Sequence, residues 1–263
     1  YTEEDKVTLY GQISSLYQEK DNDSVFFYAN LSLESAQKDK SDNSYSEAYR
    51  SLGNAYADKF DYTQALEYYL KSKAYCDKSN NKGKIISIQF SIGKAYKNLQ
   101  RFSEAINTYK QTIEIAKEIE DYKSEGSLLY YIASTYYDIN DINKSLEFAI
   151  KSANTLILHN VNTGLADTYN LIGYVHNVLK NTDLAEEYFE KAHALYLKTN
   201  DIKGLSITLN NLGIIYTNNK DIKKSIEYYS KSLEYAKQLN DNEGISTAMN
   251  NIGMLYVDMR QIE

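Results

Sequence analysis

The stretch Leu212-Gly213-Ile214-Ile215-Tyr216 decides the fold, because its pattern returns along the chain at a constant step. The pattern is an aliphatic residue, then a small residue, then tyrosine or histidine three positions later. The small residues, here called the glycine slot, stand forty positions apart at Gly53, Gly93, Ala133, Gly173, Gly213 and Gly253. A fixed step of this size predicts a repeat protein in which each repeat packs on its neighbours.

Small and aromatic residues follow the glycine slot at constant distances. Twelve residues after it stand the small residues Ala65, Ala105, Ser145, Ala185 and Ser225. Sixteen after it stand Tyr69, Tyr109, Ala149, Phe189 and Tyr229, and nineteen after it Ser72, Thr112, Ser152, Ala192 and Ser232. Steps of three and four residues lie on one helix face, so each repeat is expected to contain two helices with one buried stripe each.

Polar residues mark the connections between these helices. Four residues stand at equivalent places just before the second helix of a repeat, namely Asp61, Asp141, Asn181 and Asp221. The side-chain oxygen of each can accept a hydrogen bond from a free amide in the first turn of that helix. The chain has no proline and only 11 glycines, which suits long helices better than many-stranded β-structure. We expect thirteen principal helices, two for each of six repeats and one for a half repeat.

The offsets also predict the repeat boundaries. A divergent first repeat covers about residues 7–38, and regular repeats follow at 47–78, 86–118, 126–158, 165–197 and 205–237, with a half repeat at 245–260. We expect one solenoid over residues 1–263, cut from a longer protein. Ile252, Leu255 and Tyr256 of the half repeat would lack a second helix, so we expect them to be partly exposed and to favour end-to-end self-association.

Composition and charge exclude several function classes. The net charge is −7, from 36 acidic and 29 basic residues without a basic run, so nucleic acid is not an expected partner. No apolar run is long enough for membrane insertion. The histidines His159, His176 and His193 have no second metal ligand three or four residues later, and no nucleophile motif is present. We expect no metal, no cofactor and no catalysis, and the compartment stays open between cytoplasmic and extracytoplasmic.

At these offsets the chain resembles the tetratricopeptide repeat family, whose pattern is an aromatic residue, Leu-Gly, Tyr, Ala, an aromatic residue and Ala on two antiparallel helices. The resemblance implies an all-α fold, a right-handed superhelical solenoid of helix pairs. Two features depart from the family, since the proline that ends its repeats is absent and the step exceeds the usual length of about 34 residues. Both favour longer helices, as in kinesin light chains and in bacterial regulators that sense peptides.

Tyrosine is abundant, with 27 copies. The large ring suits a core position, and its hydroxyl can reach a hydrogen-bond partner there. The tyrosines three residues after the glycine slot are therefore expected in the core, and these are Tyr56, Tyr96, Tyr136, Tyr216 and Tyr256.

In the family, first-helix residues outside the buried stripe line the concave face. Here these positions are aromatic in the middle of the chain and asparagine-rich toward its end. The resemblance implies that asparagines hold a ligand's backbone, because an amide both donates and accepts, while aromatic rings hold apolar side chains. The candidate peptide-binding residues are Asn170, Asn210, Asn211, Asn250, Asn251, Phe90, Tyr130, Tyr131 and Tyr174.

Two alternatives to this interpretation stay open. The general abundance of asparagine in the chain also explains the asparagine series. A clamp for the carboxylate of chaperones, known in the family, is incomplete here, because Arg50 and Asn54 match it while Ser91, Ser127 and Tyr131 do not.

The leading hypothesis for function is a protein or peptide recognition module, the sensor or interaction region of a bacterial signalling or regulatory protein. The competing hypothesis is a structural scaffold or self-association domain without a dedicated peptide ligand.

Overall fold

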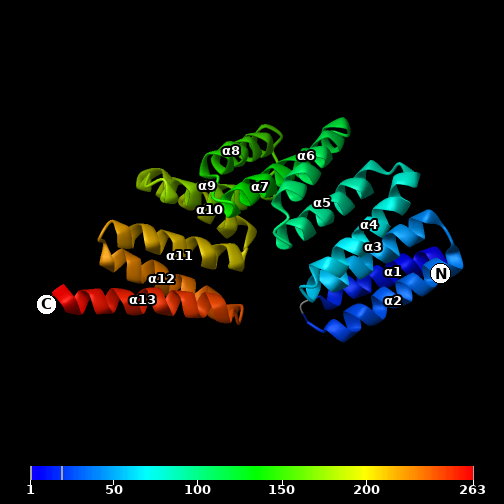
Figure 1. Ribbon diagram of the computed structural model, residues 1–263. Coiled ribbons are helices and arrows are strands. Elements are labelled where there is room, and N and C mark those ends of the chain that lie inside the picture. Colours follow the sequence, from blue (N-terminus) through cyan, green and yellow to red (C-terminus); the bar gives the residue numbers. More distant parts are fainter. Residues whose placement is uncertain (1, 19, 263) are drawn as a thin grey trace. The chain divides into compact units, whose positions relative to one another are not determined.

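The computed structural model describes residues 2–18 and 20–262, and this part of the chain contains thirteen α-helices and no strand (Figure 1). The helices are α1 (Glu3–Tyr17), α2 (Asn22–Asp39), α3 (Asp42–Asp58), α4 (Tyr62–Ser79), α5 (Lys82–Asn98), α6 (Phe102–Glu118), α7 (Tyr122–Asp138), α8 (Ile142–Leu158), α9 (Leu165–Val178), α10 (Thr182–Thr199), α11 (Ile202–Asn218), α12 (Ile222–Gln238) and α13 (Asn242–Ile262). The predictions of an all-α fold and of thirteen principal helices are confirmed.

A residue with left-handed backbone follows each helix from α2 to α12, at every twentieth position of the chain. These residues, with φ between 50° and 63°, are Lys40, Phe60, Asn80, Gln100, Glu120, Asn140, Asn160, Lys180, Asn200, Lys220 and Asn240. The next amide then bonds back into the last turn, as when Asp61 N donates to Tyr56 O at 3.0 Å. Long helices with short connections, such as α3 and α4, account for the long repeat step.

Three of the four predicted helix caps are confirmed. Asp61, Asp141 and Asp221 each accept a hydrogen bond from the amide three residues later, at 3.1, 3.2 and 3.1 Å. Asn181 stands at the start of α10, but its side chain makes no cap hydrogen bond. Its Nδ2 instead lies 3.4 Å from Nδ1 of His176, which gives this buried histidine a polar partner.

The chain divides into two compact units, Tyr1–Thr135 and Tyr136–Glu263. The first holds α1 to α6 and most of α7, and the second holds the end of α7 and α8 to α13. Neighbouring helices pack against each other within each unit, for example α3 on α4 in the first and α11 on α12 in the second. The helix pair is thus the packing element of both units.

The glycine slot is a tight crossing between the two helices of a repeat. A Cβ atom at Gly213 would lie 2.5 Å from the ring of Tyr229, and one at Gly93 would lie 2.2 Å from the ring of Tyr109. Gly53 meets Tyr69 and Gly173 meets Phe189 in the same way. The ring sixteen residues after the slot therefore occupies the space that a side chain at the slot would need.

The repeat without a slot glycine follows the same volume rule. Its slot residue is Ala133, and the residue sixteen positions later is Ala149 rather than an aromatic residue. Both alanines are fully buried. This repeat therefore has neither a glycine at the slot nor a large ring sixteen residues later.

The prediction that the tyrosines three residues after the slot belong to the core holds only for Tyr216, which is 6% exposed. Tyr256 is 53% exposed, and three others are half-buried, namely Tyr56, Tyr96 and Tyr136. At Tyr56, Tyr136 and Tyr216 the ring stacks on a ring of the second helix. Tyr216, for instance, stacks on Tyr228 with ring centroids 5.1 Å apart.

The expected exposure of the half repeat also needs one correction. Leu255 is buried, at 3% exposure, while Ile252 is half-buried. The equivalent residue of the preceding repeat, Ile215, packs on Ala185 and Phe189 of α10. This helix position faces the second helix of the preceding repeat, so its burial does not require a second helix in its own repeat.

In the described residues, no helix has both the length and the apolar character that a membrane crossing requires.

The slot predicts a contrast between two identical substitutions. Gly213→Leu should lower the free energy of unfolding by about 3 kcal/mol, because the added side chain forces Tyr229 and its helix away. Gly253→Leu should leave stability unchanged or raise it slightly, because nothing lies within 4 Å of a Cβ there and glycine costs about 0.5–1 kcal/mol inside a helix. Urea unfolding followed by circular dichroism measures both, and equal effects would show that the slot is not a tight crossing.

Candidate functional site

Asparagine side chains join the first helices of consecutive repeats in the second unit. Asn211 Nδ2 on α11 donates to Asn170 Oδ1 on α9 at 3.2 Å. One repeat later, Asn251 Nδ2 on α13 donates to Asn210 Oδ1 on α11 at 2.9 Å. The two bonds link residues the same distance apart in sequence and run in the same direction. We call these four residues the asparagine ladder.

The ladder residues differ in exposure. Asn211 is buried, at 3% exposure, while Asn170, Asn210 and Asn251 are half-buried. Asn170 Oδ1 also accepts from Thr208 Oγ1 at 3.4 Å. Since the bonds above use only their carbonyl oxygens, the NH2 groups of Asn170 and Asn210 remain as donors. Asn250, the fifth predicted asparagine, is exposed and stands outside the ladder.

Tyr174 borders the ladder. Its ring meets Phe189 edge-on at a centroid distance of 5.6 Å, and Tyr137 lies 6.4 Å away. Burial raises the pKa of the Tyr174 hydroxyl, and a hydrogen bond with the Asn211 side chain opposes that shift in pKa. The raised pKa keeps the hydroxyl neutral near pH 7.

The aromatic candidates of the first unit form a cluster around Tyr131. Phe90 lies edge-on to Tyr131 with centroids 4.8 Å apart, and Tyr130 is edge-on at 5.3 Å. The buried ring of Tyr109 lies 5.8 Å from Tyr131. Lys94 Nζ is 5.9 Å from the centroids of both Phe90 and Tyr131, at the outer limit of a cation–π contact. The cluster offers a half-buried apolar surface beside a positive charge.

The structure therefore groups the predicted site residues into two sets. Phe90, Tyr130 and Tyr131 come together in the first unit. Tyr174 and the asparagines belong to the second unit. Each set is a candidate site in its own right.

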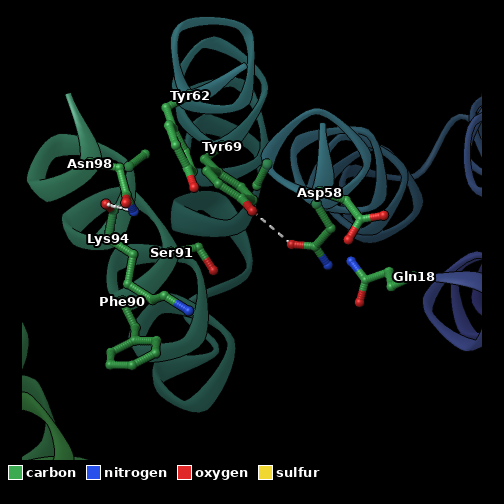
Figure 2. Close-up of a pocket in the computed structure, with 11 residues that line it drawn as sticks. Gln18, Asp58, Tyr62, Tyr69, Phe90, Ser91, Lys94 and Asn98 are labelled. Carbon is green, nitrogen blue, oxygen red and sulfur yellow. Dashed lines mark hydrogen bonds between the residues drawn. The ribbon is translucent and has the colours of Figure 1, made fainter. Parts of the chain in front are cut away.

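A hollow of about 350 Å³ in the first unit lies beside Phe90 (Figure 2). Its walls come from α3, α4 and α5, with Gln18 from the end of α1. Figure 2 shows the side chains of Tyr62, Ser91 and Lys94 directed toward a common space. The lining residues are Gln18, Asn54, Ala57, Asp58, Tyr62, Tyr69, Phe90, Ser91, Lys94, Ala95 and Asn98.

A hydrogen bond between two lining residues holds part of the wall of this hollow in place. Tyr69 Oη donates to Asn54 Oδ1 at 2.8 Å, and burial raises the pKa of Tyr69 to about 12. The amide NH2 of Asn54 thus stays available as a donor. Lys94 is exposed and supplies an ammonium group, while Asp58 supplies a carboxylate. The mixture of amide, hydroxyl and both charges suits a polar side chain better than an apolar one.

The structure gives a further reason against a carboxylate clamp. Arg50, which matches its basic residue, forms an ion pair with Glu47 on the same helix. Asn54, which matches its asparagine, is bonded to Tyr69. The arginine is therefore already neutralised by a neighbour.

Reasoning from sequence missed several residues of the hollow, among them Tyr62, Tyr69 and Asn98. Tyr69 was assigned to packing only, although its hydroxyl reaches the hollow wall. Tyr62 and Asn98 lie outside the three first-helix positions from which the candidates were drawn. One signal was present for Asn98, because a polar residue recurs five positions after the slot at Asp58, Asn98, Asp138 and Asn218.

Comparisons with known proteins support the repeat assignment. The tetratricopeptide repeat profile matches residues 44–118 and 204–263, and a second profile with the same description matches residues 166–199. No curated protein matches the chain.

Three solved structures illustrate the likeness in fold. A signal transduction ATPase with numerous domains and a tetratricopeptide repeat sensor, from Pyrococcus horikoshii, has a TM-score of 0.76 and 16% identity over 95% of this chain and 41% of its own. A Rap protein complexed with competence and sporulation factor has a TM-score of 0.74 and 15% identity over 97% and 74%. The Rap conjugation gene regulator of plasmid pLS20, in complex with the Phr* peptide, has a TM-score of 0.67 and 16% identity over 83% and 63%.

Replacing tyrosine by phenylalanine should have opposite effects on stability at two equivalent positions, Tyr109 and Tyr69. The Tyr109 hydroxyl is buried without a hydrogen-bond partner, so Tyr109→Phe should raise the free energy of unfolding by about 1 kcal/mol. Tyr69→Phe loses the bond to Asn54 and should lower it by about 1 kcal/mol. Thermal and urea unfolding check both, and a loss of stability in Tyr109→Phe would mean that its hydroxyl has a partner.

Proposed function

The chain belongs to the tetratricopeptide repeat family of protein-interaction modules, and from its asparagine ladder we propose that it binds an extended peptide segment. The observation that carries the proposal is the pair of amide–amide hydrogen bonds, Asn211 to Asn170 and Asn251 to Asn210, repeated one repeat apart. They hold the side chains in place and leave amide donors on successive first helices.

An extended peptide is the ligand chemistry that suits such a surface. Its backbone presents N–H and C=O groups at regular intervals, and an asparagine amide can pair with either. Side chains already held by hydrogen bonds lose less conformational entropy when a ligand arrives. Recognition of backbone rather than of side chains would make this part of the contact tolerant of ligand sequence.

The first unit carries a separate candidate site that is suited to side chains. The half-buried rings of Phe90, Tyr130 and Tyr131 suit an apolar side chain. The hollow beside them, with Asn54 and Lys94 in its wall, suits a polar or acidic side chain.

A sensor role in a bacterial signalling or regulatory protein is the finer form of this proposal. It is supported by the likeness in fold to a Rap protein complexed with competence and sporulation factor, to a Rap regulator in complex with the Phr* peptide, and to a protein with a tetratricopeptide repeat sensor. The proposal assigns the chain no catalytic step.

The competing function, scaffolding by self-association, has one specific observation in its favour. Several apolar residues of α13 are exposed, among them Met249 at 57% and Tyr256 at 53%. Sedimentation at rising protein concentration tests this alternative directly.

Removal of the ladder's free amides should weaken peptide binding, with some loss of stability because Asn170→Ala also removes the acceptor of the buried Asn211 amide. A linear peptide is first selected from a phage-displayed library against the chain and labelled with a fluorophore. The double variant Asn170→Ala with Asn210→Ala should bind this peptide about tenfold more weakly or worse, because each neutral hydrogen bond contributes about 0.5–1.5 kcal/mol. Fluorescence anisotropy measures the affinity, and circular dichroism checks the fold.

Two variants serve as controls in that experiment. Asn250→Ala changes an exposed asparagine outside the ladder and should affect binding less. Asn211→Ala removes a buried amide and should lower the thermal midpoint as well as the affinity. If the double variant keeps full affinity, the peptide lies elsewhere and the scaffold hypothesis gains.

The aromatic cluster is tested as a separate candidate site, with a peptide selected from the same library for apolar side chains. Tyr130→Ala should weaken that peptide by about tenfold or more alone, because burying a ring under a ligand adds a large hydrophobic contribution. Tyr122→Ala, on the same helix two turns earlier, is the matched control for the loss of a tyrosine. Equal affinities for both variants would show that the aromatic cluster is not a binding site.

A further inference from the structure

The hollow of the first unit is lined by two first helices, α3 and α5, that carry matching pairs of polar residues. On α3, Asn54 and Asp58 stand one and five residues after the glycine slot. On α5, Lys94 and Asn98 stand at the same two places. Residues four apart lie on one face of a helix, separated by about one turn of 5.4 Å. Each helix therefore contributes two polar side chains to the hollow, one turn apart.

The two residues directly after the slot both offer hydrogen-bond donors. Asn54 Oδ1 accepts from Tyr69 Oη at 2.8 Å, which leaves the Asn54 NH2 group to donate. Lys94 is exposed, and its ammonium group forms no ion pair with any residue that the structure describes. This end of the hollow is therefore suited to an anionic group.

The two residues one turn further both offer acceptors. Asp58 supplies a carboxylate. Asn98 Nδ2 donates to Lys94 O at 2.9 Å, so the Asn98 amide is oriented with Oδ1 left as an acceptor. Figure 2 shows Asp58 and Lys94 on separate helices, on opposite sides of the view. The hollow thus has a donor end and an acceptor end, and its two opposite charges do not neutralise each other.

The second unit has no such arrangement at the equivalent positions. The same two places hold Tyr174 and Val178 on α9, and Ile214 and Asn218 on α11. None of these four side chains is charged near pH 7. The hollow is therefore a different kind of site from the asparagine ladder.

We propose that the hollow binds a free α-amino acid, a small molecule that carries a carboxylate and an ammonium group on one carbon atom. The carboxylate accepts from the Lys94 ammonium group and the Asn54 NH2 group. The ammonium group donates to the Asp58 carboxylate and to Asn98 Oδ1. This inference goes beyond the peptide proposed for the ladder, and a side chain of a peptide is the competing occupant of the hollow.

The remaining walls of the hollow suit the side chain of such a ligand. The rings of Tyr62 and Phe90 line the hollow and are half-buried, so they suit an apolar side chain. The volume of about 350 Å³ lies near the lower end of the range of about 300–1,000 Å³ that is typical of small-molecule sites. A residue inside a peptide fits less well, because its two amide bonds replace both charges.

The test titrates the full chain with L-leucine, L-methionine and L-phenylalanine in isothermal titration calorimetry. We expect saturable binding of at least one of them, with one molecule bound per chain. The N-acetyl derivative and the carboxamide derivative of that amino acid should each bind about tenfold more weakly or worse, because each lacks one of the two charges.

Variants of the chain connect this binding to the two ends of the hollow. Lys94→Met removes the ammonium group and should weaken the amino acid about tenfold or more, and Lys94→Arg should recover most of that affinity. Asp58→Asn should weaken the free amino acid but have little effect on its N-acetyl derivative, which has no ammonium group. Lys123→Met, at an exposed lysine of α7 that does not line the hollow, should leave the affinity unchanged. Circular dichroism checks the fold of each variant.

Three results would overturn the proposal. The first is that none of the three amino acids binds. The second is equal affinity for the free amino acid and for its doubly capped form, since a residue of a peptide would then be the occupant. The third is an equal effect of Lys94→Met and Lys123→Met. None of these results bears on the ladder, because its residues belong to the second unit.

Discussion

The contact between a slot glycine and the aromatic ring sixteen residues later is the constraint on which the repeat depends. The ring takes the volume that any side chain at the slot would need, as the distance of 2.2 Å from a Cβ at Gly93 to the Tyr109 ring shows. Close approach of the two helices then buries the small residues beside the slot, among them Ala105 and Thr112 of the same repeat. The repeat whose slot residue is Ala133 also lacks the ring, because Ala149 stands sixteen residues later.

This packing divides the first helix of each repeat into faces with separate tasks. One face meets the second helix of its own repeat, as Gly213 meets Tyr229. Another meets the second helix of the repeat before it, as Ile215 meets Phe189. The remaining face of the first helix carries the asparagine ladder in the second unit and the aromatic cluster in the first unit. Half-buried candidates such as Asn210 and Tyr130 can therefore vary from repeat to repeat with little effect on the fold, whereas the buried Asn211 cannot.

The sequence by itself determined the helix count, the pairing and the slot, because a constant repeat step imposes the same local packing problem six times and each solution is visible in the residues. It also determined three of the caps, since an aspartate at a helix start has one obvious partner. Only the tertiary structure decided which polar and aromatic side chains are exposed and which hydrogen-bonding groups have a partner. Asn211 and Asn210 are neighbours of the same type, yet one is buried by Asn170 and Tyr174 and the other keeps its NH2. Tyr69 and Tyr109 fill equivalent slots, yet only the first finds a partner for its hydroxyl. Exposure and hydrogen-bond partners depend on residues one repeat away or on the facing helix, and periodicity along one helix carries no information about them.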